Sequence, residues 1–156
     1  MKFNELGIDG VKTSSFPFNV IVHDSPSFIT ANSKTQLHEH DGISGAVVQT
    51  NKHRGLIEKS YTLYLLNPSE TGMYQFMSFL QREGFWLESE RVKTTRLWCY
   101  RVNAAEAIKE GQNTYKVNVT FICHPTKFFK GTDTQTLTGN GVLRVQGSAL
   151  AFPKIT

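Results

Sequence analysis

Residues 57–80, IEKSYTLYLLNPSETGMYQFMSFL, decide the fold, because they pass from the period of a strand to the period of a helix. In the first ten residues, alternate side chains point to opposite faces of an extended chain. One face is mostly apolar and carries Ile57, Lys59, Tyr61, Leu63 and Leu65. The opposite face is mostly polar and carries Glu58, Ser60, Thr62 and Tyr64. This alternation predicts a strand with one buried face.

The helix that follows has its own start and stop signals. We expect Asn67 to cap it, Pro68 to occupy the first helical position and Glu70 to complete a capping box. The spacing expected of one buried helical face is shown by Met73, Phe76, Met77 and Leu80. Gly84 is placed to end the helix in a left-handed conformation. Gly72, in the helix interior, costs about 1 kcal/mol relative to Ala, and either marks close packing or has no role.

The rest of the chain predicts mostly strands. The clearest is residues 115–124, which alternate from Tyr115 to His124 and which we expect Pro125 to end. Further strands are predicted at residues 19–22, 43–49, 85–87, 97–102 and 142–145. Residues 30–42 are polar and indicate a loop, residues 104–109 a helical turn or a loop, and residues 7–10, 51–55 and 111–113 turns. The fold class is therefore mainly β with one α-helix.

Composition excludes several classes of protein. The chain has 156 residues, of which 39% are hydrophobic, including 11 Phe, so it can bury a core and is not disordered throughout. Two Cys cannot staple a chain of this length. No apolar run approaches the roughly 20 residues of a membrane helix, and the first residues do not resemble a signal peptide, so we expect synthesis in a cytosol and no membrane contact. The net charge is +4, but basic and acidic residues alternate, as in residues 88–96, which favours a solvated face over a nucleic-acid footprint.

A search for reactive groups gives one cluster with the spacing of metal ligands. His38 and His40 would share a face of a strand, and Asp41, His53 or Cys123 could supply a third ligand. Residues 42–45 lack the Glu that a cupin site would need, so a polar loop is the favoured interpretation. No nucleophile elbow and no phosphate-binding loop occurs. We therefore expect no enzymatic activity, and we name no catalytic, cofactor-binding or metal residue.

The cysteines and aromatic residues have ordinary and functional interpretations. Cys99 and Cys123 are either a redox pair or disulfide, or, more commonly for such residues, small buried thiols. Some aromatic side chains could stack on sugars or bases, although core packing is the more common role: Trp86, Trp98, Tyr100, Phe128 and Phe129. The last two could also contact a neighbouring domain or subunit.

The ordered set of segments resembles the N-terminal domain of the distal tail proteins of long-tailed phages that infect Gram-positive bacteria. The matching pieces are residues 3–5 with 16–22, residues 42–66, the helix at 67–84 followed by Phe85-Trp86-Leu87, and Phe121-Ile122-Cys123-His124-Pro125 followed by Lys127-Phe128-Phe129. The resemblance implies a β-sandwich or split barrel with one helix and a projecting hairpin. It assigns residues 1–138 to this domain and residues 139–156 to the start of a truncated or missing C-terminal β-sandwich.

The function that the resemblance implies is structural. Members of this family form a six-subunit ring that joins the tail tube to the tail tip or baseplate of the virion, after assembly in the host cytoplasm. The implied partners are further copies of the chain, the tail tube protein, a tail-tip protein and, through the second domain, a receptor-binding protein. DNA crosses the lumen without specific binding, so we expect Lys and Arg to lie outside the lumen or to be paired there. Residues 30–42 would belong to a hairpin or loop that becomes ordered against a neighbour.

Three other functions remain open from the sequence. A carbohydrate-binding β-sandwich would present Trp86 or Trp98 as a flat, exposed platform. A nucleic-acid-binding β-protein would present a contiguous basic face, with binding that weakens strongly with salt. A metal enzyme would hold its ion on His38 and His40.

Overall fold

The structure is a computed structural model that describes residues 5–24, 26–132, 134–144 and 147. The strands are β1 (Leu6–Ile8), β2 (Val11–Lys12), β3 (Asn19–Val22), β4 (Ser33–Glu39), β5 (Ala46–Arg54), β6 (Ile57–Leu66), β7 (Glu83–Ser89), β8 (Thr95–Val102), β9 (Ala107–Lys109) and β10 (Thr114–Phe129). The α-helix is α1 (Glu70–Leu80), and a 3₁₀ turn, η1, spans Thr13–Ser15.

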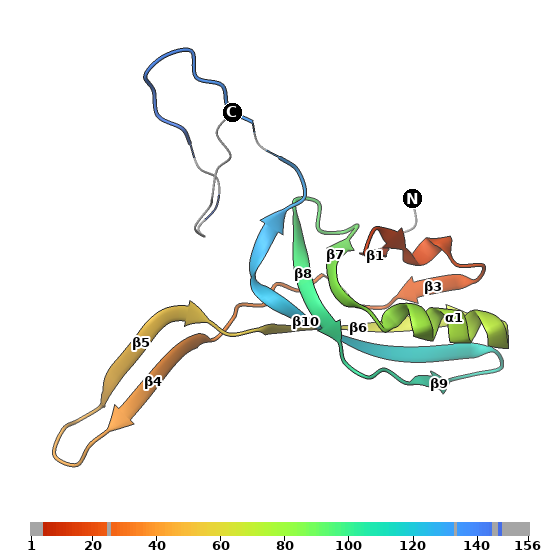
Figure 1. The fold of residues 1–156 in the computed structure, drawn as a ribbon. Helices are drawn as coiled ribbons and strands as arrows, with labels where there is room; N and C mark the ends of the chain where they lie inside the picture. The colour runs from red at the N-terminus through yellow and green to blue at the C-terminus, as the bar shows by residue number, and fades with distance from the viewer. Residues whose placement is uncertain (1–4, 25, 133, 145–146, 148–156) are drawn as a thin grey trace.

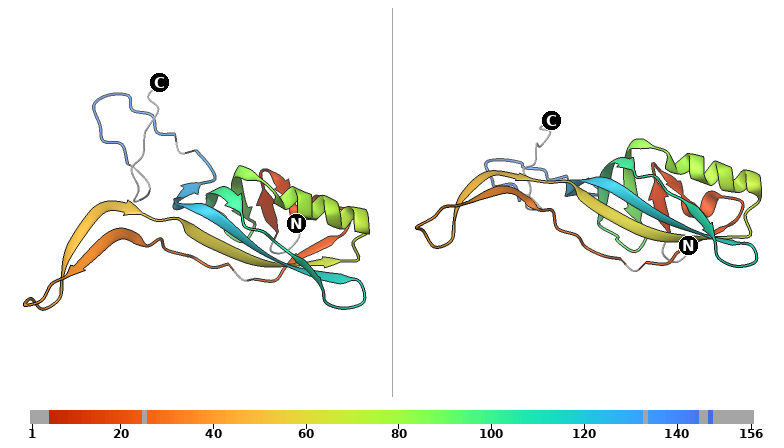
Figure 2. Two further views of the ribbon diagram at one scale, coloured as in Figure 1. Left: turned by 60° about the horizontal axis from the view of Figure 1, so that its bottom comes forward. Right: turned by 90° about the horizontal axis from the view of Figure 1, so that it is seen from below.

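Eight of these strands form one antiparallel sheet in the order β2-β1-β7-β8-β10-β6-β3, with β9 also paired to β10. The sheet curls into a half-barrel, and α1 lies along it (Figure 1). The remaining two strands, β4 and β5, pair only with each other and project far from this body (Figures 1 and 2). These elements confirm the predicted fold class, mainly β with one helix.

Strands β6 and β10 are the spine of the sheet. They pair without interruption from Leu66 opposite Thr114 to Ile57 opposite Cys123. The predicted alternation of β6 is confirmed, because its five odd-numbered positions from 57 to 65 are all buried. The buried set includes Lys59, a charged residue on the inner face of the sheet.

The predicted end of β10 at Pro125 is wrong, since the strand continues to Phe129. Proline lacks the N–H that a ladder needs, and it is tolerated where pairing is interrupted. Here the pairing with β6 ends at Cys123, and the pairing with β8 shifts register between Cys123 and Lys127. Pro125 therefore lies in the one stretch of β10 where its missing N–H breaks no paired position.

The predicted helix is confirmed, but both of its predicted ends are wrong. The side chain of Ser69, not Asn67, accepts a hydrogen bond from the Gly72 N–H. Asn67 has a positive φ of 50° and donates its N–H to the Asn113 carbonyl, so it still belongs to the end of the sheet. The helix stops at Leu80, and Gly84 has the expected positive φ of 62° but lies within β7.

An aromatic cluster attaches α1 to the body. Phe76 is fully buried, and its ring meets those of Phe16 and Phe18 edge-on at centroid distances of 5.0 and 6.0 Å. Gly72 is buried beside them, and a Cβ there would lie 3.1 Å from Phe18 Cε1, so the close-packing interpretation of this glycine is confirmed. The helix is thus held by aromatic rings that come from the segment before β3.

Three local predictions fail because strand pairing decided them. Residues 33–39 form β4 rather than a loop, and residues 51–54 continue β5 rather than turn. Residues 107–109 form β9 because they pair with Tyr115, Lys116 and Val117 of β10.

The expected strand at 142–145 does not form over residues 142–144.

The division into residues 1–138 and 139–156 remains a prediction. Residues 139–144 and 147 contain no strand, and the other residues of the proposed second unit lie outside the described part of the chain. Phe3 and Asn4, which contribute to the resemblance, lie outside it too. None of the helices in the described part is long and apolar enough to cross a membrane.

Candidate interaction surface

The hairpin of β4 and β5 presents apolar side chains to solvent. Leu37 and Val48 are direct partners across the two strands, which places them on one face, and they are 65% and 60% exposed. Thr35 and Thr50 lie on the same face, and their hydroxyls form a hydrogen bond of 3.2 Å. We call these four residues, with Ala46 and its partner Glu39 at the outer end, the hairpin face. No part of the described chain covers it.

A two-stranded ribbon without a second layer is only marginally stable in water. All of β5 is exposed, and β4 is exposed except at Thr35. The opposite side of the ribbon is more polar and carries the contact between His38 Nε2 and Gln49 Oε1 at 3.2 Å, beside Val47. The two sides therefore differ in chemistry, and the hairpin face is the one suited to burial against a protein.

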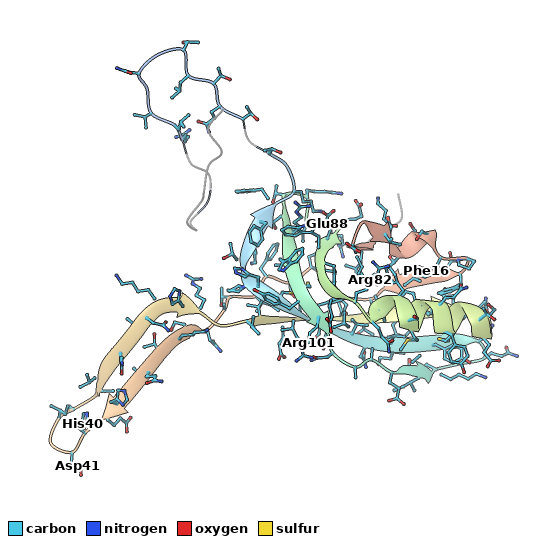
Figure 3. All side chains as sticks on the ribbon, in the orientation of Figure 1. Phe16, His40, Asp41, Arg82, Glu88 and Arg101 are labelled. Carbon is cyan, nitrogen blue, oxygen red and sulfur yellow. The ribbon has the colours of Figure 1, made fainter. Side chains whose placement is uncertain are left out.

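The tip of the hairpin contains two of the candidate metal ligands, His40 and Asp41 (Figure 3). Gly42 and Gly45 adopt positive φ values of 94° and 90° there, which glycine reaches without strain. His40 and Asp41 lie in this turn, beyond the end of β4, so His38 and His40 do not share a strand face as the metal hypothesis required.

The other proposed ligands lie elsewhere. His53 is near the base of the hairpin, and Cys123 is buried in the core. Within residues 5–24, 26–132, 134–144 and 147, no group of three potential ligands comes together. The structure therefore gives the metal hypothesis no geometric support.

The two cysteines are buried thiols in contact. Cys99 and Cys123 are direct partners across β8 and β10, both fully buried, and their Sγ atoms are 2.8 Å apart. They are free cysteines, as the sequence interpretation favoured. The hydrogen bond to Cys123, together with burial, raises the pKa of Cys99, so its thiol stays protonated and unreactive at neutral pH.

The aromatic residues of β7, β8 and β10 pack on one another rather than forming a platform. The rings of Trp86 and Trp98 are 4.9 Å apart and inclined at 72°, and Phe128 meets Trp86 at 79°. The guanidinium of Arg96 lies over Trp86, with its Cζ 3.9 Å from the ring centre. A sugar stacks on a flat, open ring, so this arrangement does not favour the carbohydrate interpretation.

In residues 88–96, where basic and acidic residues alternate, most of the charged side chains form ion pairs. Arg96 forms an ion pair with Glu88 at 3.5 Å, and Lys93 and Lys12 both pair with Glu90, at 3.7 and 3.0 Å. The bond with Lys12 lowers the pKa of Glu90 and raises that of Lys12. These pairs agree with a solvated face of both signs.

Comparison with known proteins adds a likeness of fold. No protein-family model matches the chain, and no curated protein sequence matches it. A solved structure does: the Dit protein (gp 19.1) of phage SPP1, described as a paradigm of hub adsorption apparatus in phages that infect Gram-positive bacteria. The TM-score is 0.60 at 16% sequence identity, over 82% of this chain and 53% of that protein. The chain thus shares its fold with this hub protein and spans about half of its length.

Sequence reasoning found the aromatic and histidine residues but missed the hairpin face. Leu37 and Val48 are separated by a polar turn, and neither lies in a periodic apolar segment. The available signal was the pair Val47-Val48 within residues 43–49, where the sequence predicts a strand without showing what it pairs with.

Proposed function

We propose that this chain is a structural subunit of a phage tail, forming the ring that joins the tail tube to the tail tip or baseplate. The observation that carries the proposal is the projecting hairpin with its exposed hairpin face, on a fold shared with a phage hub protein. A neighbouring copy that covers Leu37 and Val48 would remove most of their apolar surface from water. That burial contributes about 1–2 kcal/mol for each side chain.

A closed ring also explains how the sheet edges are managed. Unpaired edge strands expose N–H and C=O groups that favour association with another chain. In a ring every copy contributes the same hairpin and receives its neighbour's, so no contact is left open. The tail tube protein and a tail-tip protein would be partners on the two sides of the ring, with receptor binding assigned to a second domain. DNA would cross the lumen without specific contacts.

The test compares two sets of hairpin variants. Leu37→Ser with Val48→Ser removes the two large apolar side chains of the hairpin face, and Val47→Ser is the matched control on the opposite side of the ribbon. Each protein is co-produced with the tail tube and tail-tip proteins and examined by light scattering and electron microscopy. We expect rings from the unchanged chain and the control, and monomers from the double variant.

Two results would contradict the proposal. One is a wild-type chain that stays monomeric and unattached in the presence of both tail proteins. The other is a double variant that assembles as well as the wild type. Circular dichroism spectra of all three proteins establish that the body of the molecule is folded in each case.

A further inference from the structure

A small cavity lies between Ser27 and Phe28 on one side and the inner face of the main sheet on the other. Its volume is about 40 Å³. Ligand pockets for drug-sized molecules are far larger, at roughly 300–1,000 Å³. The cavity can therefore hold an ion or a few water molecules, and its character is set by the polar groups that line it.

Lys59 is the most unusual of these groups. It lies on the inner face of β6 and is only 5% exposed. Its ammonium donates hydrogen bonds of 2.5 Å to the carbonyl and to the hydroxyl of Ser27. Among the described residues no carboxylate forms an ion pair with it, and the Asp24 carboxylate, which is close enough to favour the charged form, accepts a hydrogen bond from the Thr62 N–H.

A buried ammonium is unfavourable where the loss of its water outweighs the opposite charge nearby. At Lys59 the Asp24 carboxylate favours the charged form, but desolvation is the larger effect. Burial lowers the pKa of Lys59, and the nearby charge of Lys127 lowers it further. The fold thus places two like charges at the cavity. Lys59 is buried, whereas Lys127 is exposed and its Nζ lies 5.4 Å from the ring centre of Phe28. An anion between the two ammonium groups would reduce their repulsion.

The other donors complete the arrangement. Lys127 lies opposite Leu97 in the pairing of β8 with β10, so both side chains face the cavity that they line. Tyr61 lines it too, and burial raises the pKa of its hydroxyl, which therefore remains a neutral O–H donor. Arg96 also borders the cavity, but its guanidinium pairs with Glu88. None of the described lining residues is acidic.

We propose that this cavity binds one small monovalent anion, of the size of chloride or formate. The ammonium groups of Lys59 and Lys127 would supply the charge, and the Tyr61 hydroxyl would supply a neutral hydrogen bond. Leu97 and Phe28 supply apolar lining, and Phe28 is 73% exposed, so the cavity is reached from solvent on that side. The proposal is independent of the ring, because every contact comes from a single copy of the chain.

The test is thermal unfolding in sodium chloride, sodium formate and sodium gluconate at equal ionic strength. Gluconate is too large for the cavity and controls for screening. An anion that binds only the folded state raises the folding equilibrium constant tenfold for each tenfold rise in anion concentration above its Kd. For a chain of this size, each such step raises Tm by about 3–5 °C. We expect this dependence with chloride, formate or both, and a flat response with gluconate.

Two variants separate the cavity from the surface. Lys59→Met removes the buried charge and is expected to abolish the dependence on the small anions. Lys109→Met, at an exposed position of β9, is expected to retain it. Equal Tm values in all three salts, or an unchanged dependence in Lys59→Met, would overturn the proposal.

Crystals of the unchanged protein grown in sodium bromide give a measurement that does not require the variant to fold. We expect an anomalous peak between Lys59 Nζ and Lys127 Nζ. A cavity that contains only water at high bromide concentration would be decisive against an anion site.

Discussion

Replacing Phe76 with Ala should remove a large part of the stability of the body, because this one side chain anchors α1. Phe76 has no exposed surface, and two edge-to-face contacts surround it, with Phe16 at 5.0 Å and with Phe18 at 6.0 Å. Truncating a buried Phe costs about 3–5 kcal/mol through lost burial and the cavity that remains. Each aromatic pair adds about 0.5–1.5 kcal/mol beyond burial.

We therefore expect Phe76→Ala to lower the free energy of unfolding by an amount near the upper end of that range. Since domains are stable by only about 5–15 kcal/mol, this loss is between about a third and all of the stability of the body. Phe76→Leu retains much of the volume and should lose less, which keeps the comparison measurable if the Ala variant does not fold.

The measurement is urea unfolding followed by circular dichroism and tryptophan fluorescence, with the slope against urea compared between variants. Tyr74→Ala is the matched control, because Tyr74 lies on the same helix but is 67% exposed. It should change the free energy of unfolding by no more than about 0.5 kcal/mol. A loss below about 1.5 kcal/mol for Phe76→Ala at unchanged slope would show that the aromatic cluster does not hold the helix.

Further outcomes follow from the same structure. Ser69→Ala should cost about 1 kcal/mol in urea unfolding, since it removes the helix cap, and an unchanged midpoint would contradict the assigned cap. Gly72→Ala should fail to give the gain of about 1 kcal/mol expected in a helix interior, because the new Cβ would lie 3.1 Å from Phe18 Cε1 and from Ser69 Oγ; a full gain would show that the cluster can yield. Cys99 and Cys123 should react with a thiol reagent only after unfolding, and rapid labelling of the folded protein would exclude the buried assignment.

The candidate interaction surface could be anticipated only in part. The polar composition of residues 30–42 led to the hypothesis of a hairpin or loop that becomes ordered against a neighbour, and the structure shows a hairpin there. Its apolar side could not be recognised, because neither strand of the ribbon has a face buried within the chain. The alternation that identifies a strand is produced by such burial.

The anion cavity left a weak signal in the sequence. Lys59 occupies an inward position in an otherwise apolar alternation, between Ile57 and Tyr61. A charged residue on this buried face indicates that polar groups lie around its side chain inside the fold. Which groups these are depends on Ser27 and Lys127, which are distant along the chain.

The local order of residues determined that β6 is a half-buried strand and that an amphipathic helix follows it. Both properties depend on side chains a few positions apart, so periodicity is enough to specify them. Tertiary structure alone decided which potential cap the helix uses, where β10 continues past Pro125, and that residues 107–109 are extended. Each of these depends on a backbone partner in another strand or turn: Asn113 for Asn67, the shifted register of β8 for Pro125, and the following strand β10 for β9. A hydrogen bond across a sheet is set by the register of two strands, and neither strand encodes that register by itself.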